Sequence, residues 1–394
     1  MKLYQAASGL HDSEAVTAAH KDIFAALAET FDIELLPVSD LKGATGTAML
    51  FVATGGVEES VREAIEASGI TMIYLVADGL QNSLAASMEI AAWLRSNGIG
   101  AKIIHGTPAE MVDELQMVRI GEALRGCRVG LMGGSSGWLI SSGIDYKAVG
   151  DKYGIEFIPV SLDEIIDEYH KSDPANVEGI YDMKLVEPTN ADLVKALKLT
   201  KAIETVVGRH RLDAFTLKCF DLLDPLGTTG CLPLAVLNSK GIPAGCEGDV
   251  PALLTMLLAR RVAGVDAFMA NPSRIDTSNN EIIFAHCTLP INMARTNILR
   301  SHFESGIGVA LQGMLPESEV TVLKWWGRDM DRHFISRGRI VENLDNPSMC
   351  RTQVRLHLDE SVEYFLSNPL GNHHIILLGD HTATLSHFFD NFEG

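Results

Sequence analysis

The stretch from Ala48 to Gly106 reads AMLFVATGGVEESVREAIEASGITMIYLVADGLQNSLAASMEIAAWLRSNGIGAKIIHG and decides the expected fold class. Three short apolar runs in it have the composition of buried strands, and two longer segments between them repeat apolar residues at helical spacing. The strands are predicted at residues 48–53, 71–77 and 101–106, and the helices at residues 57–69 and 83–98. The second helix is expected to start at an N-cap, Ser83, and to stop at Gly98. Strands that alternate with helices predict βαβ units around a mostly parallel sheet.

The alternation returns further along the chain and then gives way to strands alone. A strand is predicted at residues 128–132, a long helix at residues 190–207, and a short strand with a turn at residues 241–249. From about Phe268 strand candidates follow one another with short connections, which is typical of an antiparallel sheet or barrel. These candidates are residues 281–289, 306–313, 319–328, 333–342, 350–359 and 373–381. We therefore predict an α/β protein with two doubly wound α/β domains, residues 1–126 and 127–267, followed by a C-terminal antiparallel β-barrel-like domain, residues 268–394.

Composition and charge exclude several classes of partner. The chain has 394 residues, and its 51 Asp and Glu against 32 Lys and Arg give a formal charge of −19. This charge repels nucleic acid and anionic membranes, and no dense basic cluster offsets it. No run reaches the roughly 18 apolar residues that a membrane helix needs, so the sequence predicts a cytoplasmic protein. The six cysteines include no C-x-x-C pair, which favours reduced thiols over a disulfide framework or a thiolate zinc site.

The motif Cys246-Glu247-Gly248-Asp249 places two carboxylates at the predicted end of a strand. Open α/β sheets bind ligands at such strand ends, where a carboxylate can hold a hard cation or take a proton from carbon. Asp249 has an alternative role as the N-cap of the helix that follows it. The segment Gly133–Gly137 also follows a strand, and it is either a tight turn that needs glycine or a loop that faces a substrate.

Histidines and a further carboxylate near strand ends extend the candidate set. His286 ends an apolar strand, where it is either a core histidine or a ligand. His373 and His374 are adjacent, and because consecutive strand residues face opposite sides, only one of them can readily face a given site. Glu304 lies in glycine-rich surroundings and has a structural role as its alternative. An oxygen-rich set of this kind suits Mn²⁺ or Mg²⁺.

Several motifs resemble the L-fucose isomerase family and, more distantly, the L-arabinose isomerases. They are TTGCLPLAVLNSKGIPAGCEGDVPALLTMLL, FMANPS, AHCTLP, HFESG and GNHHIILLGDH, all between residues 228 and 381. The resemblance implies a ring-like homo-oligomer, a trimer or hexamer, with a divalent metal site, Mn²⁺ as the expected cation and no organic cofactor. It also implies interconversion of an aldose and its ketose through a cis-enediol, in which the metal holds the sugar oxygens and a carboxylate moves a proton.

The family match assigns metal ligands by position. Glu247 corresponds to a carboxylate ligand and His374 to the histidine ligand, while His286 is a further ligand by a looser match to the arabinose isomerases. Asn271 stands where the family has a metal-binding Asp. An amide oxygen can bind a cation but cannot accept a proton, so this departure puts the two-base proton shuttle in question.

Three further residues are candidates for contact with the sugar. Trp138 follows the glycine-rich turn and is expected to form an aromatic wall near a subunit contact, with a packed core residue as the alternative. Arg351 and Gln353 are candidate substrate-binding residues. Alternatively, the Arg is an exposed strand residue or the partner of a buried carboxylate.

The sequence leads to two hypotheses of different classes. The first is a metal-dependent aldose–ketose isomerase acting on a free deoxy- or pentose sugar, with Glu247 and Glu304 as catalytic carboxylates. The second is a non-catalytic sugar-binding or regulatory relative that keeps the fold and has lost one base. Asn271 separates them, because catalysis is retained only where another carboxylate such as Glu304 reaches the site. Epimerisation at the same enediol would use the same residues.

Overall fold

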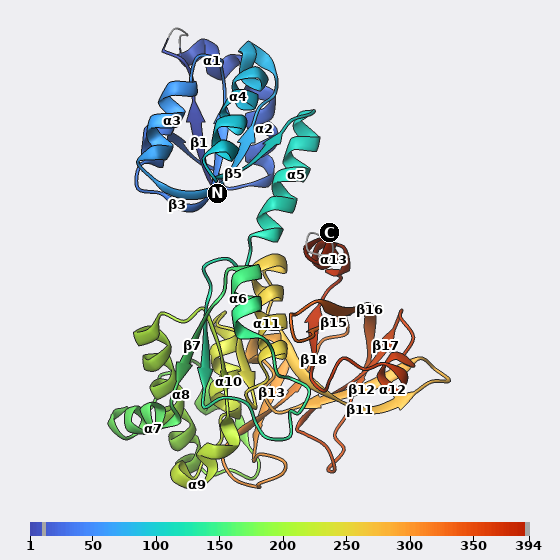
Figure 1. Ribbon diagram of the computed structural model, residues 1–394. Coiled ribbons are helices and arrows are strands. Elements are labelled where there is room, and N and C mark those ends of the chain that lie inside the picture. The colour runs from blue at the N-terminus through green and yellow to red at the C-terminus, as the bar shows by residue number, and fades with distance from the viewer. Residues whose placement is uncertain (10–12, 391–394) are drawn as a thin grey trace. The chain divides into compact units, whose positions relative to one another are not determined.

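The computed structural model describes residues 1–9 and 13–390. The chain divides into two compact units, Met1–Arg119 and Ile120–Gly394, each with its own buried core (Figure 1). None of the helices in the described residues combines the length and the apolar character needed to span a membrane. The limits predicted for the three domains at residues 126 and 267 stay predictions.

The N-terminal unit is built on a five-stranded parallel sheet in the order β2-β1-β3-β4-β5. Its strands are β1 Lys2–Ala6, β2 Glu34–Pro37, β3 Thr45–Val52, β4 Gly69–Val76 and β5 Gly100–Ile104. Its helices are α1 Ser13–Ala19, α2 Lys21–Thr30, α3 Glu58–Glu66, α4 Ser83–Ser96 and α5 Pro108–Gly121. The alternation predicted within residues 48–106 is confirmed, because the apolar residues of those strands and helices, such as Leu50, Ile65 and Ile90, share one core.

The start of α4 differs from the prediction by one residue. Asn82 is the N-cap, with φ of 65°, and Ser83 is the first helical residue. The Ser83 hydroxyl accepts a hydrogen bond from the N–H of Gly79 at 3.0 Å. Ser83 therefore stabilises the turn that precedes the helix.

The second unit contains a four-stranded parallel sheet in the order β10-β9-β6-β7. Its strands are β6 Arg128–Met132, β7 Glu156–Val160, β9 Ala214–Leu217 and β10 Ala244–Cys246. The helices of this part are α6 Tyr146–Tyr153, α7 Leu162–Lys171, α8 Asn190–His210, α9 Leu223–Leu226, α10 Cys231–Ser239 and α11 Val250–Leu258. Strands β7 and β9 flank β6 on opposite sides, so the order of winding switches at β6. Such switch points leave a crevice at the carboxyl ends of the strands.

A closed barrel of six antiparallel strands follows in the same unit, in the order β11-β12-β17-β16-β15-β18. The strands are β11 Phe268–Asp276, β12 Glu281–His286, β15 Glu319–Trp326, β16 Arg332–Asn343, β17 Thr352–Leu358 and β18 His374–Leu378. Apolar residues that include Phe284, Val322 and Ile376 form one buried cluster. The predicted fold class, α/β sheets followed by an antiparallel barrel, is confirmed.

One predicted strand lies outside the barrel. The candidate at residues 306–313 corresponds to β14 Ala310–Met314, which joins β13 Thr296–Arg300 and β8 Lys184–Leu185 in a separate three-stranded sheet. Two further helices, α12 Tyr364–Ser367 and α13 Thr382–Asp390, follow the strands β17 and β18.

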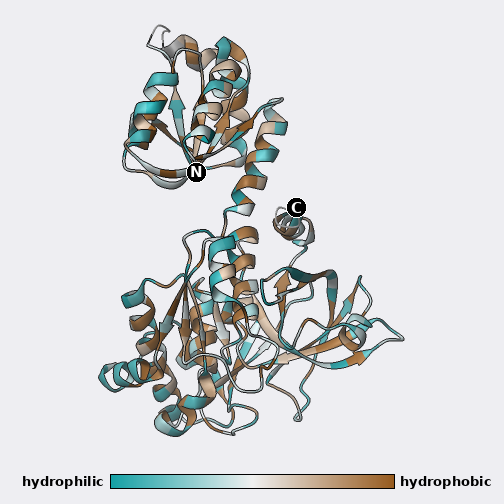
Figure 2. Cartoon of the chain, viewed as in Figure 1, coloured by the Kyte–Doolittle hydropathy of each residue, from teal (hydrophilic) through white to brown (hydrophobic). Residues whose placement is uncertain are grey.

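Helix α11 connects the parallel sheet to the barrel. All nine of its residues are buried, whereas α7 buries only Ile165 and Tyr169. In Figure 2, α11 is coloured mainly as hydrophobic and α7 mainly as hydrophilic. The Thr255 hydroxyl of α11 accepts a hydrogen bond at 3.1 Å from the N–H of Trp325 in β15. This contact helps to hold α11 between the parallel sheet and the barrel. The turn just before α11, which carries Glu247, therefore lies where the sheet and the barrel meet.

Candidate active site

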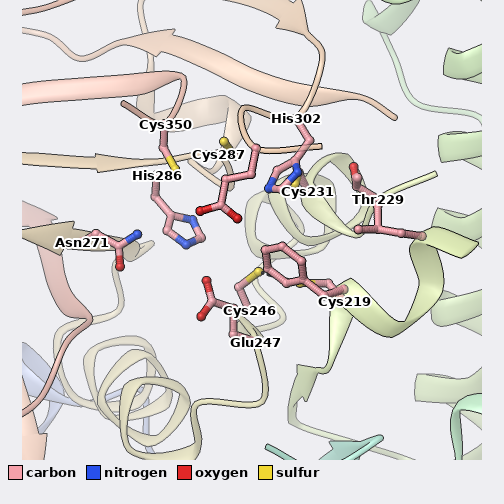
Figure 3. Close-up of a pocket in the computed structure, with 13 residues that line it drawn as sticks. Cys219, Thr229, Cys231, Cys246, Glu247, Asn271, His286, Cys287, His302 and Cys350 are labelled. Atoms are coloured by element: carbon pink, nitrogen blue, oxygen red, sulfur yellow. Dashed lines mark hydrogen bonds between the residues drawn. The ribbon is translucent and has the colours of Figure 1, made fainter. Parts of the chain in front are cut away.

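A pocket with about 460 Å³ of empty volume lies at this junction. Its polar lining residues are Thr229, Glu247, Asn271, His286, His302 and Glu304. Figure 3 shows the side chains of Glu247, Asn271 and His286 pointing into the same space from three separate segments. Four residues selected from the sequence therefore line one pocket: Glu247 after the parallel sheet, Asn271 and His286 in the barrel, and Glu304 between β13 and β14.

The turn that carries Glu247 is held by the glycine-rich segment after β6. Glu247 has φ of 61° and Gly248 has φ of 73°, so two successive residues adopt left-handed backbone conformations. The N–H of Ser136 donates to the carbonyl of Glu247 at 2.9 Å, and the Ser135 hydroxyl donates to the carbonyl of Gly248 at 2.8 Å. The segment Gly133–Gly137 thus supports the turn that carries Glu247.

Gly248 leads to the first prediction. A Cβ at this position would lie 2.1 Å from the carbonyl oxygen of Gly134 and would also require a left-handed conformation. Gly248→Ala is therefore expected to lower the free energy of unfolding by about 1–3 kcal/mol. Urea denaturation measures the loss, and Gly208→Ala, where a Cβ meets nothing within 4 Å, is the matched control. Equal stability of the two variants would contradict the close packing of the two turns.

Asp249 has the N-cap role that the sequence analysis gave as its alternative, and it also contacts a buried histidine. Its Oδ1 accepts a hydrogen bond at 3.0 Å from the N–H of Ala252 and so caps α11. Its Oδ2 lies 2.9 Å from Nδ1 of the fully buried His373. The other ring nitrogen of His373, Nε2, lies 3.7 Å from Oε1 of Glu247. His373 therefore stands between two carboxylates.

These contacts set the charges of the site. Burial favours the neutral form of Glu247, but the nearby His373, the charge of His286 and the Trp138 hydrogen bond prevail and lower the Glu247 pKa to about 2. Burial favours neutral His373 as well, yet Asp249 and Glu247 raise its pKa to about 9. Burial and the neighbouring His373 lower the pKa of His286 to about 4. At neutral pH Glu247 is ionised, His373 is protonated and His286 is neutral.

Two buried polar atoms beside Glu247 are suited to a cation. Asn271 Oδ1 and His373 Nε2 have no hydrogen-bond partner among the described residues, and a buried polar atom without a partner destabilises the folded state. A divalent ion bound to Asn271 Oδ1 and His373 Nε2 would supply the missing partner of each atom. His373 would lose its Nε2 proton when the ion binds. Asp249 contacts Nδ1 of His373, the ring nitrogen on the side away from Glu247. Metal-binding histidines commonly donate their second ring N–H to a carboxylate in this way. Glu247, Asn271 and His373 thus fit a hard divalent cation such as Mn²⁺.

The structure does not bring His374 to this group. Its Nε2 lies 3.0 Å from the Tyr364 hydroxyl and its Nδ1 lies 2.8 Å from the carbonyl oxygen of Asn372, so both ring nitrogens have partners away from Glu247. Aromatic rings, including that of Phe365, surround it. Since neighbouring strand residues face opposite sides, the structure gives His373 the position that the family match gave to His374.

Trp138 contacts the candidate catalytic carboxylate directly. Its indole N–H donates to Oε2 of Glu247 at 2.6 Å, and its ring meets the edge of Phe220 with the centroids 5.0 Å apart. The side chain is 54% exposed, so the alternative of a packed core tryptophan is wrong. Its expected role as an aromatic wall for the sugar stays a prediction.

Arg351 and Gln353 have structural partners and do not line the pocket. Arg351 donates from Nε to the carbonyl of Ser301 at 2.8 Å and from Nη2 to the Ser301 hydroxyl at 3.1 Å. The buried Gln353 amide bonds to backbone groups of Asn346 and Cys350 at 2.8–2.9 Å. Because these contacts occupy their polar groups, the structure does not support the prediction that they bind substrate.

The sequence analysis missed the thiols of this site. Five of the six cysteines line the pocket, and they are Cys219, Cys231, Cys246, Cys287 and Cys350. Three of them follow an apolar strand closely in the sequence, in AFTLKC, IPAGC and IIFAHC. The repeated occurrence of cysteine at strand ends was therefore the sequence signal that could have placed thiols in the site.

Comparisons with known proteins point to sugar isomerases. No family model matches the chain. It is similar to proteins named sulfoquinovose isomerase, with 31% identity over 168 residues to that of Clostridium sp. (strain MSTE9), which covers 40% of this chain and 37% of the relative. Identity to the Priestia aryabhattai protein is 22% over 265 residues, covering 62% of this chain and 58% of the relative. The matched region thus spans little more than half of that relative. The comparisons support a relationship to sugar isomerases in general, and the specific likeness to the L-fucose isomerases stays a prediction.

Proposed function

We propose that the chain is a metal-dependent aldose–ketose isomerase that acts on a free sugar through a cis-enediol. The observation that carries the proposal is that two buried atoms lack hydrogen-bond partners: Asn271 Oδ1, whose residue lines the pocket with the ionised Glu247, and His373 Nε2, which lies 3.7 Å from Glu247 Oε1. The names of the relatives agree with this reaction class. A second carboxylate, Glu304, lines the same pocket, which favours a catalytic over a purely sugar-binding protein.

The residues of the chain can perform the proton transfer between C1 and C2. When bound, a divalent cation polarises the sugar oxygens and offsets the negative charge of the enediolate. Glu247 is unprotonated and can accept a proton at a carboxylate oxygen, while the Trp138 N–H fixes its Oε2. Asp249 orients His373 through Nδ1. Glu304 is the candidate for the second proton transfer, because Asn271 carries no acidic proton.

The lining of the pocket favours a neutral sugar. It includes the carboxylates of Glu247 and Glu304, and no Lys or Arg belongs to the described lining. The sugar in the names of the relatives, sulfoquinovose, carries a sulfonate, and the described lining offers no Lys or Arg side chain to pair with it. We therefore propose a free deoxy- or pentose sugar as the substrate. A homo-oligomer and the choice of Mn²⁺ stay proposals that come from the family resemblance, and a cytoplasmic location stays a proposal that comes from the sequence.

A substrate panel tests the proposed function. The full chain, loaded with Mn²⁺, is incubated with 6-deoxyhexoses, pentoses and sulfoquinovose, and ketose formation is followed by nuclear magnetic resonance. We expect Mn²⁺-dependent ketose formation, with higher kcat/KM for a neutral aldose than for sulfoquinovose. Sugar binding without ketose from any aldose would instead support the non-catalytic hypothesis. Turnover of sulfoquinovose and of no other sugar would agree with the proposed isomerase reaction but would contradict the proposed neutral substrate.

Asn271 offers a prediction about cation affinity. Asn271→Asp adds a negative charge next to the proposed cation, so Mn²⁺ should bind at least about tenfold more tightly. Isothermal titration measures the affinity, and Asn97→Asp on the exposed end of α4 is the control. Weaker Mn²⁺ binding by the Asn271 variant would show that this side chain does not present its oxygen to the ion.

A further inference from the structure

The pocket also contains a group of donors that includes sulfur. The Cys246 sulfur, a Glu247 carboxylate oxygen and a His286 ring nitrogen all lie within 4.8 Å of one another. His286 Nδ1 lies 2.8 Å from the Thr288 hydroxyl, which leaves Nε2 for this group. The three donors come from the end of β10, from the turn after it and from the end of β12. Strand ends in two different sheets hold them in place.

A second thiol adjoins the group. The sulfur of Cys219 lies 3.1 Å from that of Cys246, and both side chains are buried. The two residues follow adjacent parallel strands, β9 and β10, whose pairing places Cys246 opposite Leu217. Soft sulfur donors therefore gather on one side of Glu247, and the oxygen donor Asn271 approaches from another segment, as Figure 3 shows.

The two sets of donors differ in the cation they prefer. Carboxylate and amide oxygens suit Mn²⁺ and Mg²⁺, while thiolate and imidazole suit Zn²⁺ and similar thiophilic ions. Affinities at mixed sites also increase from Mn²⁺ to Zn²⁺ in general. A coordinating thiol loses its proton on binding, so the protonated Cys246 of the cation-free protein is no obstacle.

We propose that Cys246, Glu247 and His286 form a binding site for a thiophilic divalent cation, with Zn²⁺ as the reference ion. Glu247 belongs to this site and to the oxygen-rich set with Asn271 and His373, so cations at the two sites compete for its carboxylate. Zn²⁺ is therefore expected to displace Mn²⁺ from the protein. This property goes beyond the proposed isomerase reaction and does not depend on it.

Cobalt absorption spectroscopy tests the site without any sugar. Co²⁺ is titrated into the full chain, and a sulfur-to-cobalt charge-transfer band in the near ultraviolet is expected. Cys246→Ser should abolish the band and weaken Zn²⁺ binding at least about tenfold, with Mn²⁺ affinity unchanged, since an oxygen-preferring ion gains little from a thiolate. Cys350→Ser is the matched control, because Cys350 lines the same pocket but does not belong to the three-donor group. The charge-transfer band should persist in this variant.

Two outcomes would overturn the proposal. One is a wild-type cobalt complex without the charge-transfer band, and the other is a band that persists in Cys246→Ser. X-ray absorption on the Zn²⁺-loaded wild type needs no variant, and a sulfur neighbour at about 2.3 Å is expected. A zinc environment of nitrogen and oxygen alone would also overturn it. None of these outcomes bears on whether the Mn²⁺-loaded protein isomerises a sugar.

Discussion

Glu247→Gln is expected to lower ketose formation by at least about 10³-fold, because the amide keeps the shape of the side chain but cannot accept the C2 proton. The same change removes a negative charge from the proposed cation site, so Mn²⁺ binding should weaken as well. The measurement is turnover at saturating Mn²⁺ on the best aldose of the panel, together with Mn²⁺ affinity. Saturating Mn²⁺ separates the loss of the base from the loss of the ion.

The control for Glu247 is another carboxylate with no assigned part in the site. Glu63 is exposed on α3, so Glu63→Gln should leave turnover and Mn²⁺ affinity unchanged. Undiminished turnover in Glu247→Gln would remove Glu247 from the proton transfer. Turnover that returns fully when Mn²⁺ is raised would reduce its role to that of a ligand.

His373→Gln is expected to weaken Mn²⁺ binding by about 10–100-fold or more. Loss of a residue that only contacts a metal ligand typically weakens metal binding by this factor, and loss of a ligand should weaken it at least as much. Its Nε2 faces Glu247 and its Nδ1 pairs with Asp249, whereas both nitrogens of His374 have partners elsewhere. His374→Gln is the matched control. It should leave Mn²⁺ affinity unchanged while lowering the free energy of unfolding by about 1–3 kcal/mol, since it disturbs a buried hydrogen bond.

The two histidine variants give a clear contrast. Titration calorimetry provides the affinities, and urea denaturation shows whether each variant is folded. A loss of Mn²⁺ affinity in His374→Gln with none in His373→Gln would restore the assignment made from the family match and contradict the geometry.

Much of the fold could be predicted because its elements have strong local patterns. Each strand of the barrel is an apolar run bounded by turns, and β3 to β5 alternate with amphipathic helices. The partner of a strand is not encoded locally, and for that reason β14 could not be separated from the barrel strands. The fully buried α11 was predicted as a helix, but the sequence does not say that it is covered by a sheet on one side and a barrel on the other.

The candidate site was partly predictable for a similar reason. Strand ends and the family motifs selected Glu247, Asn271 and His286, which line one pocket. The choice between His373 and His374 depends on which side of β18 faces the parallel sheet, and the sequence alternation leaves that open. The contact of Arg351 with Ser301 could not be predicted, because Ser301 lies 50 residues away in the chain and such contacts leave no local pattern.

The expectations for the Glu247, Asn271 and His373 variants depend on one cation that these three residues hold. The most direct test is an anomalous difference map from crystals of the full chain grown with Mn²⁺. We predict a single strong peak in the pocket, about 2.0–2.6 Å from a Glu247 carboxylate oxygen, Asn271 Oδ1 and His373 Nε2. A pocket without an anomalous peak at saturating Mn²⁺, or a peak bound by other residues, would contradict the account.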